Sequence, residues 1–239
     1  MNMQSQIAYD FIRKRIISGE YAPDSFISGK GLAGEIGVSR TPIRDALRQL
    51  EQEGLVKMTP GYGAQVRSLS PDEFAQIWVT RVALEGMAGL LAAKFRSEED
   101  LALMDVNMRA LWSEARAFDP ATWTAADQAR FAVRDRAFHE LILAATRNRI
   151  LADEAARLHL IQTTIFESRE DFGKWMKSPL LTCQEHQGII EAIRNQESKL
   201  ARSLVEEHLE YSATTGELCR RPTTRQTVSD VAPVSALAG

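Results

Sequence analysis

The segment from residue 32 to residue 50 constrains the fold more than any other part of the chain. A short apolar stretch runs into Gly37, the residue type that lets a chain leave a helix through a left-handed conformation. Ser39 stands where the N-terminal cap of a following helix is expected, and Pro42 falls in the first turn of that helix. The apolar residues then recur at helical spacing, namely Ile43, Ala46, Leu47 and Leu50. The segment therefore predicts two helices joined by a tight turn.

The outer face of the second of these helices carries arginine and hydroxyl side chains. They are Arg40, Thr41, Arg44 and Arg48. An arginine-bearing amphipathic helix is, on its own, more often a solvated structural helix than a ligand-binding one. Together with the tight turn and the cap, however, the pattern matches a helix-turn-helix, which presents such donors to the DNA major groove. DNA binding is therefore the leading hypothesis.

The flanking residues extend this motif on both sides. Two short strands, at about 55–58 and 64–67, are predicted around a turn rich in Pro and Gly at 59–63, which together form a β-hairpin wing. Upstream, a first amphipathic helix ends at Gly19, and Phe26 with Ile27 can add a small strand. The apolar stripe of that first helix is Ile7, Phe11, Ile12, Ile16 and Ile17. Residues 1–68 therefore predict a winged helix-turn-helix domain.

The motif from Gly37 to Leu47, followed by Leu50 and by Glu53-Gly54-Leu55-Val56, resembles the winged-helix signature of the GntR superfamily of bacterial transcription regulators. The resemblance spans about the first 67 residues. It implies a set of DNA-contacting positions, which are Lys30, Ser39, Arg40, Thr41 and Arg44 with the wing residues Gly61, Tyr62 and Gly63. One departure is Asp24, a turn position where the family more often has Gly.

The distribution of charge is uneven along the chain. The formal net charge is −3, but residues 1–67 hold nine Lys and Arg against seven Asp and Glu, which is an excess of two positive charges. A sign of this kind suits a nucleic-acid partner. The excess is so small that one such domain should bind DNA weakly. We therefore expect a homodimer that binds a palindromic operator in double-stranded DNA.

Bulk properties indicate an ordinary globular chain. Of the 239 residues, 44% are hydrophobic and 26% charged, and no apolar run reaches the length of a membrane span. The N-terminus lacks the pattern of a signal peptide. Cys183 and Cys219 lack metal-ligand spacing. We expect a cytoplasmic protein without a membrane partner.

Residues 69–218 read as an all-α helical bundle. Ser70, Pro71 and Glu73 form a start signal of the capping-box kind. Helices are predicted at about 71–95, 98–116, 125–146, 149–171, 180–195 and 197–217. The low-complexity residues 219–239 are expected to form a disordered tail. The predicted fold is thus mainly α, with an N-terminal winged helix-turn-helix and a C-terminal helical domain.

Polar residues interrupt the apolar stripes of three of these helices. Asp135 and His139 are four residues apart and share a face with Phe131, Phe138 and Ile142. His186 shares a stripe with Ile189, Ile190 and Ile193, and His208 shares one with Leu200, Leu204 and Tyr211. An unpaired buried carboxylate is costly, and a metal ion bound by imidazole and carboxylate would remove that cost. The alternative is that Asp135 pairs with a buried His or Arg. His159 only flanks an apolar stripe and is left out of the predicted site.

This second region, over about residues 71–212, resembles the all-helical effector domain of the FadR-type branch, called the FCD domain. The matching residues are Arg81, Leu84-Glu85, Asp135 to His139, Asn148, Glu185-His186, Ile189, Ala192-Ile193 and Glu207-His208-Leu209. The resemblance implies one divalent metal ion on Asp135, His139, His186 and His208, with zinc as first choice and nickel or manganese as alternatives. A departure is Asn195-Gln196, where an acidic turn such as Gly-Asp is common.

The same resemblance implies a small carboxylate metabolite as effector beside the metal. Arg81 is the candidate for its carboxylate, because a guanidinium group matches a carboxylate in two-pronged geometry. An internal salt bridge from Arg81 to Glu85 is the equal alternative. The predicted function is a homodimeric, metabolite-responsive transcription regulator, with repression expected. A metal-dependent enzyme acting on a small organic acid and an architectural DNA-binding protein are the competing readings.

Overall fold

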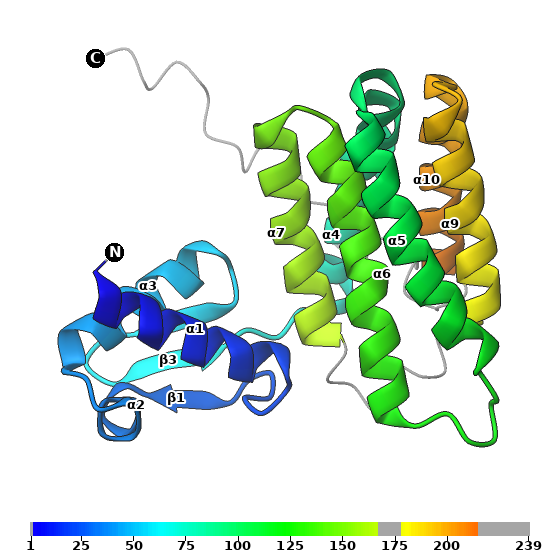
Figure 1. The fold of residues 1–239 in the computed structure, drawn as a ribbon. Coiled ribbons are helices and arrows are strands. Elements are labelled where there is room, and N and C mark those ends of the chain that lie inside the picture. Colours follow the sequence, from blue (N-terminus) through cyan, green and yellow to red (C-terminus); the bar gives the residue numbers. More distant parts are fainter. Residues whose placement is uncertain (1, 167–177, 215–239) are drawn as a thin grey trace, which may run out of the picture.

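The chain folds into a winged-helix domain followed by a helical bundle (Figure 1). The computed structural model describes residues 2–166 and 178–214. The winged helix contains α1 (Met3–Ile17), β1 (Phe26–Ser28), α2 (Gly29–Ile36), α3 (Arg40–Gln52), β2 (Val56–Thr59) and β3 (Gly63–Val66). The bundle contains α4 (Pro71–Phe95), α5 (Glu98–Arg116), α6 (Ala125–Ala145), α7 (Arg149–Phe166), α9 (Pro179–Arg194) and α10 (Ser198–Thr214). This architecture confirms the predicted fold class.

The three strands form one antiparallel sheet in the order β1-β3-β2, and β2 and β3 make the wing. Helix α1 packs against α3, and the predicted stripe of α3 is buried. Ile12 and Ile16 of the predicted stripe of α1 are also buried, but Ile7 is 48% exposed. The core of the domain therefore uses only the later turns of that stripe.

The turn between α2 and α3 has the predicted left-handed residue at Gly37, whose φ is 75°. Ser39 occupies the N-cap position with extended backbone, but its side chain makes no capping hydrogen bond. The expected cap is therefore wrong in this detail. The reason is Pro42, which is the third residue of the helix and lacks the N–H that a capping serine would otherwise bind.

Two departures from the family pattern fall on left-handed backbone. Asp24 has a φ of 64° and Gln196 a φ of 59°. Asp tolerates this conformation better than most residues, and the side chain of Asp24 also accepts a hydrogen bond from Ser68 at 2.7 Å. Gln196 lies in the turn between α9 and α10. Glutamine tolerates a positive φ less well than aspartate does.

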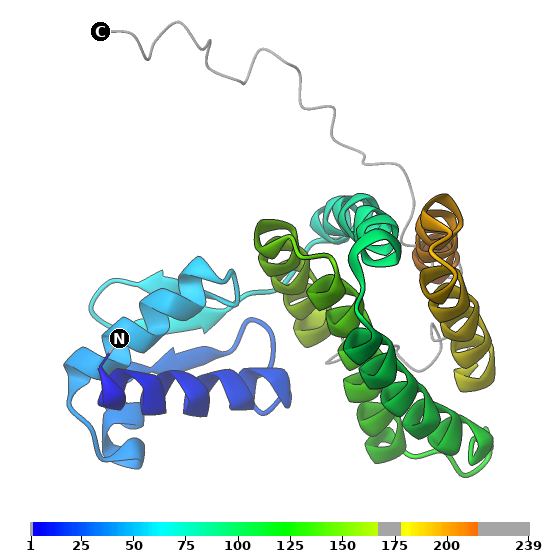
Figure 2. The same cartoon turned by 45° about the horizontal axis from the view of Figure 1, so that its top comes forward.

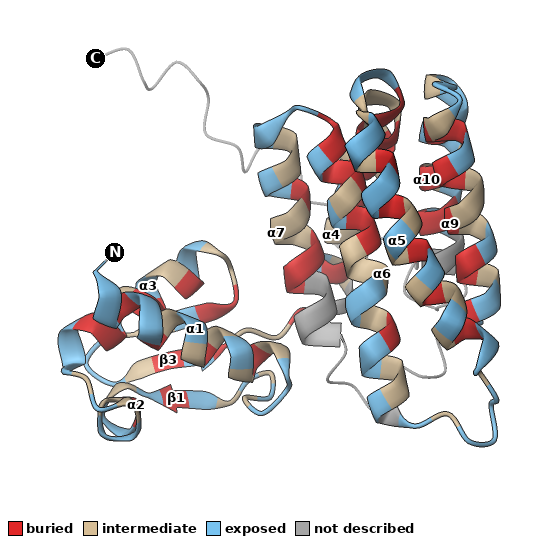
Figure 3. Ribbon diagram, in the orientation of Figure 1, coloured by how far each residue is buried: buried red, intermediate tan, exposed pale blue. Residues whose placement is uncertain are grey.

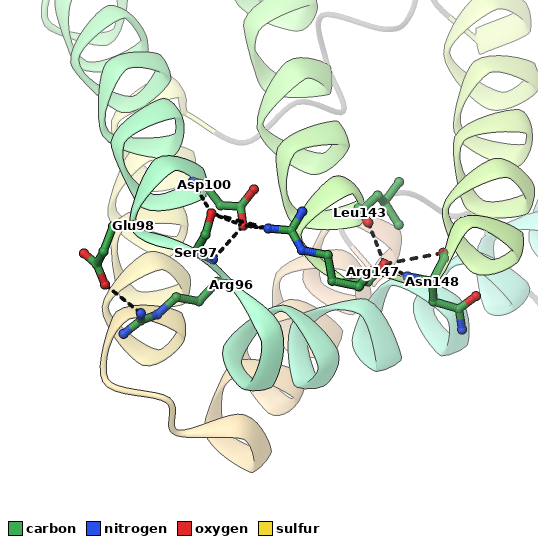
Figure 4. A network of polar contacts seen from close by, with 8 residues as sticks. Arg96, Ser97, Glu98, Asp100, Leu143, Arg147 and Asn148 are labelled. Atoms are coloured by element: carbon green, nitrogen blue, oxygen red, sulfur yellow. Dashed lines mark hydrogen bonds and ion pairs between the residues drawn. The ribbon is translucent and has the colours of Figure 1, made fainter.

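Capping boxes start three helices of the bundle. The Ser70 hydroxyl accepts a hydrogen bond from the N–H of Glu73, and the Glu73 carboxylate accepts one from the N–H of Ser70, as predicted. Ser97 and Thr124 begin α5 and α6 in the same way. Figure 4 shows that Arg147, in the turn between α6 and α7, also donates hydrogen bonds to the α5 cap at Ser97 and Asp100. The turn is thereby tied to the start of α5.

Helix α4 is the centre of the bundle and packs against α6, α7, α9 and α10. Its approach to α10 is close because Gly89 has no side chain: a Cβ there would lie 2.9 Å from the Ala201 carbonyl oxygen and 3.0 Å from Val205 Cγ2. The buried residues of these helices face the interior of the bundle (Figure 3). They bring residues from distant parts of the chain into one core.

The core of the winged helix continues into the bundle. It includes Phe74 from α4 and Leu160 and Ile161 from α7, and Trp78 packs against both cores. Figure 2 shows α7 as the bundle helix beside the winged helix. The two domains therefore meet through apolar side chains of α4 and α7.

Most predicted helix limits agree with the structure to within one residue. The expected extensions to residues 171 and 217, the tail at 219–239 and Cys219 lie outside the described residues. Cys183 is buried, and burial, followed by the charges of Asp135 and Glu114, raises the pKa of its thiol to about 12. Within residues 2–166 and 178–214, no helix is long and apolar enough to cross a membrane.

Candidate functional site

All but one of the residues predicted to contact DNA are exposed in the winged helix. The exposed side chains are Lys30, Ser39, Arg40, Thr41 and Arg44, together with Gly61 and Tyr62 at the wing. Tyr62 is 74% exposed. Arg40 and Arg44 lie on successive turns of α3 and are exposed, whereas Ile43 and Leu47 of the same helix are buried. The fold therefore leaves the basic side chains of Lys30, Arg40 and Arg44 accessible to a partner.

Gly63 is only half-buried and has a structural role in the wing. Its φ is 149°, and a Cβ at this position would lie 2.0 Å from the carbonyl oxygen of Ile27. Only a glycine lets β3 approach β1 this closely. The requirement for glycine at this predicted DNA-binding position therefore comes from the packing of the strands.

Three histidines from three helices meet in the core of the bundle. His139 comes from α6, His186 from α9 and His208 from α10, and all three are buried. One ring nitrogen of each lies within 4.8 Å of the others, and Nε2 of His186 is 3.3 Å from Nε2 of His208. The structure thus brings together the three predicted histidine ligands.

Two glutamates hold two of these rings. Oε2 of Glu85 lies 2.7 Å from Nδ1 of His139, and Oε2 of Glu185 lies 2.6 Å from Nδ1 of His208. An ionised carboxylate only accepts hydrogen bonds, so each Nδ1 is the donor, and in the neutral ring, the form that binds a metal, Nε2 carries the lone pair. Histidines that bind metals are commonly oriented in this way. The orienting role of both glutamates was not predicted from the sequence, although Glu185 directly precedes His186.

The fourth predicted ligand is less buried than expected. The side chain of Asp135 is 29% exposed, and its Oδ1 lies 3.5 Å from Nε2 of His186. Helical spacing predicted that Asp135 and His139 share an otherwise apolar face, but the Asp135 end of that face is partly exposed. The carboxylate therefore lies beside the histidine cluster without being enclosed in it.

Arg81 forms the internal salt bridge that was its alternative assignment. Its guanidinium donates to Oε1 of Glu85 at 2.8 Å, and its Nη2 lies 3.2 Å from Nδ1 of His159. Arginine only donates, so Nδ1 of His159 must accept. His159 was omitted from the predicted site, yet it is 4% exposed and in contact with it. A histidine beside an apolar stripe was the available signal.

Burial and charge set the protonation of this group. Burial, reinforced by the positive charge of Arg81, lowers the pKa of His159 well below its usual value, so this imidazole is neutral. Burial alone would raise the pKa of Glu85, but the charges of Arg81 and His139 outweigh it and hold that pKa below its usual range. Glu85 is therefore an ionised carboxylate that accepts hydrogen bonds from both Arg81 and His139.

The donor set fits a divalent transition metal. Two imidazole nitrogens, each about 2.0–2.1 Å from a zinc ion, lie about 3.3–3.4 Å apart in tetrahedral geometry. The 3.3 Å between the Nε2 atoms of His186 and His208 falls in that range. The residues present can therefore hold an ion, with Nε2 as the ligand atom on His139 and His208, because Nδ1 of each ring faces a glutamate.

A winged helix joined to a helical bundle with a buried histidine cluster defines a two-domain DNA-binding regulator. The chain belongs to the GntR family: the description "Bacterial regulatory proteins, gntR family" matches residues 4–66, and the FCD domain matches residues 76–211. Proteins of this family are transcription regulators, and so is this chain. It is not an enzyme, which removes the metalloenzyme alternative.

Relatives of known sequence extend over most of the chain. The uncharacterized HTH-type transcriptional regulator YdhC of Bacillus subtilis is 26% identical over 205 residues, covering 85% of this chain and 86% of its own. The HTH-type transcriptional repressor GlaR of Escherichia coli is 28% identical over 217 residues, covering 87% and 94%. The solved structure of E. coli McbR/YncC shares the fold, with a TM-score of 0.71, 18% identity and coverage of 90% and 97%.

Proposed function

We propose that this protein is a homodimeric repressor that binds a palindromic operator, carries one divalent metal ion and responds to a small carboxylate metabolite. The observation that carries the metal-dependent part is the histidine cluster whose rings are oriented by two carboxylates. Repression is supported by the similarity to GlaR, which is named a repressor. Such a regulator would act in the cytoplasm, beside the DNA.

Operator recognition is assigned to α3 and the wing. Arg40 and Arg44 are exposed on successive turns at the N-terminal end of α3, where a recognition helix meets base edges and phosphates. The Ser39 hydroxyl makes no capping bond within the protein, so it can donate to a phosphate instead. Lys30, Thr41 and the wing residues Gly61, Tyr62 and Gly63 complete the proposed contact set.

The metal is assigned to Asp135, His139, His186 and His208. Carboxylates of Glu85, Asp135 and Glu185 lie against the proposed histidine ligands. Negative groups beside imidazole nitrogens favour a cation at this place. Nitrogen and oxygen ligands suit zinc first, and nickel or manganese as alternatives.

The effector is assigned to an open coordination position on that ion. A carboxylate would supply the oxygen ligand. Arg81 is close to this place because Glu85 bonds both Arg81 and His139. Because Arg81 already pairs with Glu85, an incoming carboxylate would have to share or replace that bond. The effector carboxylate therefore competes with a resident one.

Metal analysis of the purified protein and thermal unfolding test this function. We expect close to one divalent ion per chain, a fall in Tm on chelation, and recovery of Tm with Zn²⁺. His186→Ala should abolish metal binding and the effect of the chelator on Tm. Gln184→Ala, on the exposed side of the same helix, should preserve both. A protein free of metal that gains no stability from zinc, nickel or manganese would refute the metal assignment.

A panel of small organic acids tests the effector. An acid that raises Tm only in the metal-loaded protein, changes operator affinity and is recovered unchanged would identify the class. Sedimentation tests the dimer: we expect twice the chain mass at micromolar concentration, and weak binding to a single half-site. A monomer with full affinity for one half-site would contradict it.

A further inference from the structure

A continuous line of buried polar contacts runs from a proposed metal ligand on α6 to helix α7. His139 bonds Glu85 at 2.7 Å, Glu85 bonds Arg81 at 2.8 Å, and Arg81 bonds His159 at 3.2 Å. Each of the four residues is at most 4% exposed. Because no solvent separates these groups, a shift of one requires the next to follow or to lose its partner. We call Glu85, Arg81 and His159 the relay.

The far end of the relay lies next to the winged helix. The two residues after His159 on α7 are Leu160 and Ile161, which belong to the core of the DNA-binding domain. Gly54, the second residue after α3, is in direct contact with this helix: a Cβ added to it would lie 3.0 Å from Cδ1 of Ile161. Helix α7 thus contacts the relay and the end of the proposed recognition helix through adjacent residues.

Helix α4 makes a second connection from the same arginine. The guanidinium carbon of Arg81 lies 5.7 Å from the centre of the Trp78 ring, and that ring lies 5.8 Å from the ring of Phe74. Phe74 is buried in the core of the winged helix. Both helices that join the domains are therefore anchored at Arg81, and the Arg81–His159 bond fixes them to each other.

We propose that the relay couples occupation of the metal site to the placement of the winged helix, with Glu85 and His159 as positioning residues. This inference rests on the proposed metal and operator binding. An ion at the histidine cluster fixes the ring of His139, and its Nδ1–H fixes Glu85. Arg81 and His159 then hold α4 and α7 in one relative position, and this fixes the position of α3 relative to the bundle. Without the ion, the polar groups can adopt other pairings, and the position of α3 relative to the bundle is less defined.

The decisive measurement is the ratio of operator affinities of the metal-loaded and metal-free full-length protein. The probe is Zn²⁺ alone, or Ni²⁺ or Mn²⁺ where the protein retains that ion better. Couplings of this kind are typically about 5–150-fold, and we expect a ratio in that range for the natural sequence. His159→Leu, which cannot accept from Arg81, should bring the ratio to within about twofold of unity while the protein still binds metal.

Two further variants separate the relay from general damage. His159→Asn places an amide oxygen near the position of Nδ1, so it should restore most of the ratio. Arg157→Ala removes a side chain of α7 that is 40% exposed and pairs with Glu154, and it should leave the ratio unchanged. If His159→Leu fails to fold, Ile161→Ala serves instead, because it removes contact with Gly54 while leaving the relay intact, and it should reduce the ratio likewise.

The outcomes distinguish the relay from the function on which it rests. A natural protein that binds neither metal nor operator refutes the proposed function and the relay together. A natural protein that binds both, with a ratio that His159→Leu and Ile161→Ala leave unchanged, refutes the relay alone. A ratio of one in the natural protein refutes the coupling even where metal binding is confirmed.

Discussion

Nδ1 of His208 donates a hydrogen bond to the Glu185 carboxylate across 2.6 Å, from α10 to α9. This bond fixes the tautomer of His208, because the proton on Nδ1 leaves the lone pair on Nε2. That nitrogen lies 3.3 Å from Nε2 of His186, the residue that follows Glu185 in the chain. A single pair of adjacent residues on α9 thus supplies one proposed ligand and orients another.

Replacing Glu185 with Gln should weaken metal binding by about 10–100-fold, because loss of an orienting carboxylate has that typical effect. The neutral amide no longer raises the basicity of the His208 ring and can also bond it in the wrong tautomer. Competition with a chromophoric chelator measures the change. Glu191→Gln, on the exposed part of the same helix, is the matched control. Equal metal affinity in both variants would show that Glu185 does not orient a ligand.

Arg44→Ala should reduce operator affinity by about 1–3 kcal/mol if the guanidinium reads a guanine. Loss of a phosphate contact alone would instead weaken binding to all sequences and lower the salt dependence. Titrations at two salt concentrations, on operator and on unrelated DNA, separate the two. Lys14→Ala removes the same charge from another helix of the domain and should have a smaller effect. Unchanged affinity in both Arg40→Ala and Arg44→Ala would remove α3 from the contact surface.

Gly89→Ala should destabilise the bundle by about 1–3 kcal/mol, since overfilling a packed interface costs that much. The added Cβ would lie 2.9 Å from the backbone oxygen of Ala201, which cannot move without moving α10. Gly34→Ala is the control, because nothing lies within 4 Å of a Cβ there, and it should stabilise α2 by about 0.5–1 kcal/mol. Denaturant unfolding measures both changes. A neutral Gly89→Ala would mean that α10 can shift freely along α4.

Gln196→Gly should raise the free energy of unfolding by about 0.5–1 kcal/mol, because glycine adopts the left-handed φ of 59° without strain. Asp24→Gly should gain less, since it also loses the hydrogen bond from Ser68. Chemical denaturation of the two variants beside the natural protein tests the order. A larger gain at residue 24 would show that the hydrogen bond contributes little.

The DNA-binding half of the fold was predictable because its signals are local. The left-handed Gly37, the stripe of α3, the wing and the capping box at Ser70 each depend on residues within a few positions of one another. Ser39 is the exception, because Pro42 lacks the N–H that a capping serine would bind, and the predicted capping bond is therefore absent. The roles of the exposed basic residues in DNA binding stay predictions.

The histidine cluster was predictable only as a set of residue types on buried faces. Spacing placed His139, His186 and His208 toward one core, and the fold brings them together. It placed Asp135 on the same buried face, but the structure leaves that side chain 29% exposed. Helical periodicity predicts the direction in which a side chain points from the helix axis. It does not predict whether a neighbouring helix extends far enough to cover that side chain.

The sequence by itself determined the helices, the wing and the residue types available for a site. Only the tertiary structure paired Arg81 with Glu85 in the bundle core, and it alone placed His159 against that arginine. These two residues are 78 positions apart, and no local preference links them. Their contact exists because α4 and α7 bury apolar faces against each other, and once solvent is excluded, each buried polar group must find its partner on a neighbouring helix.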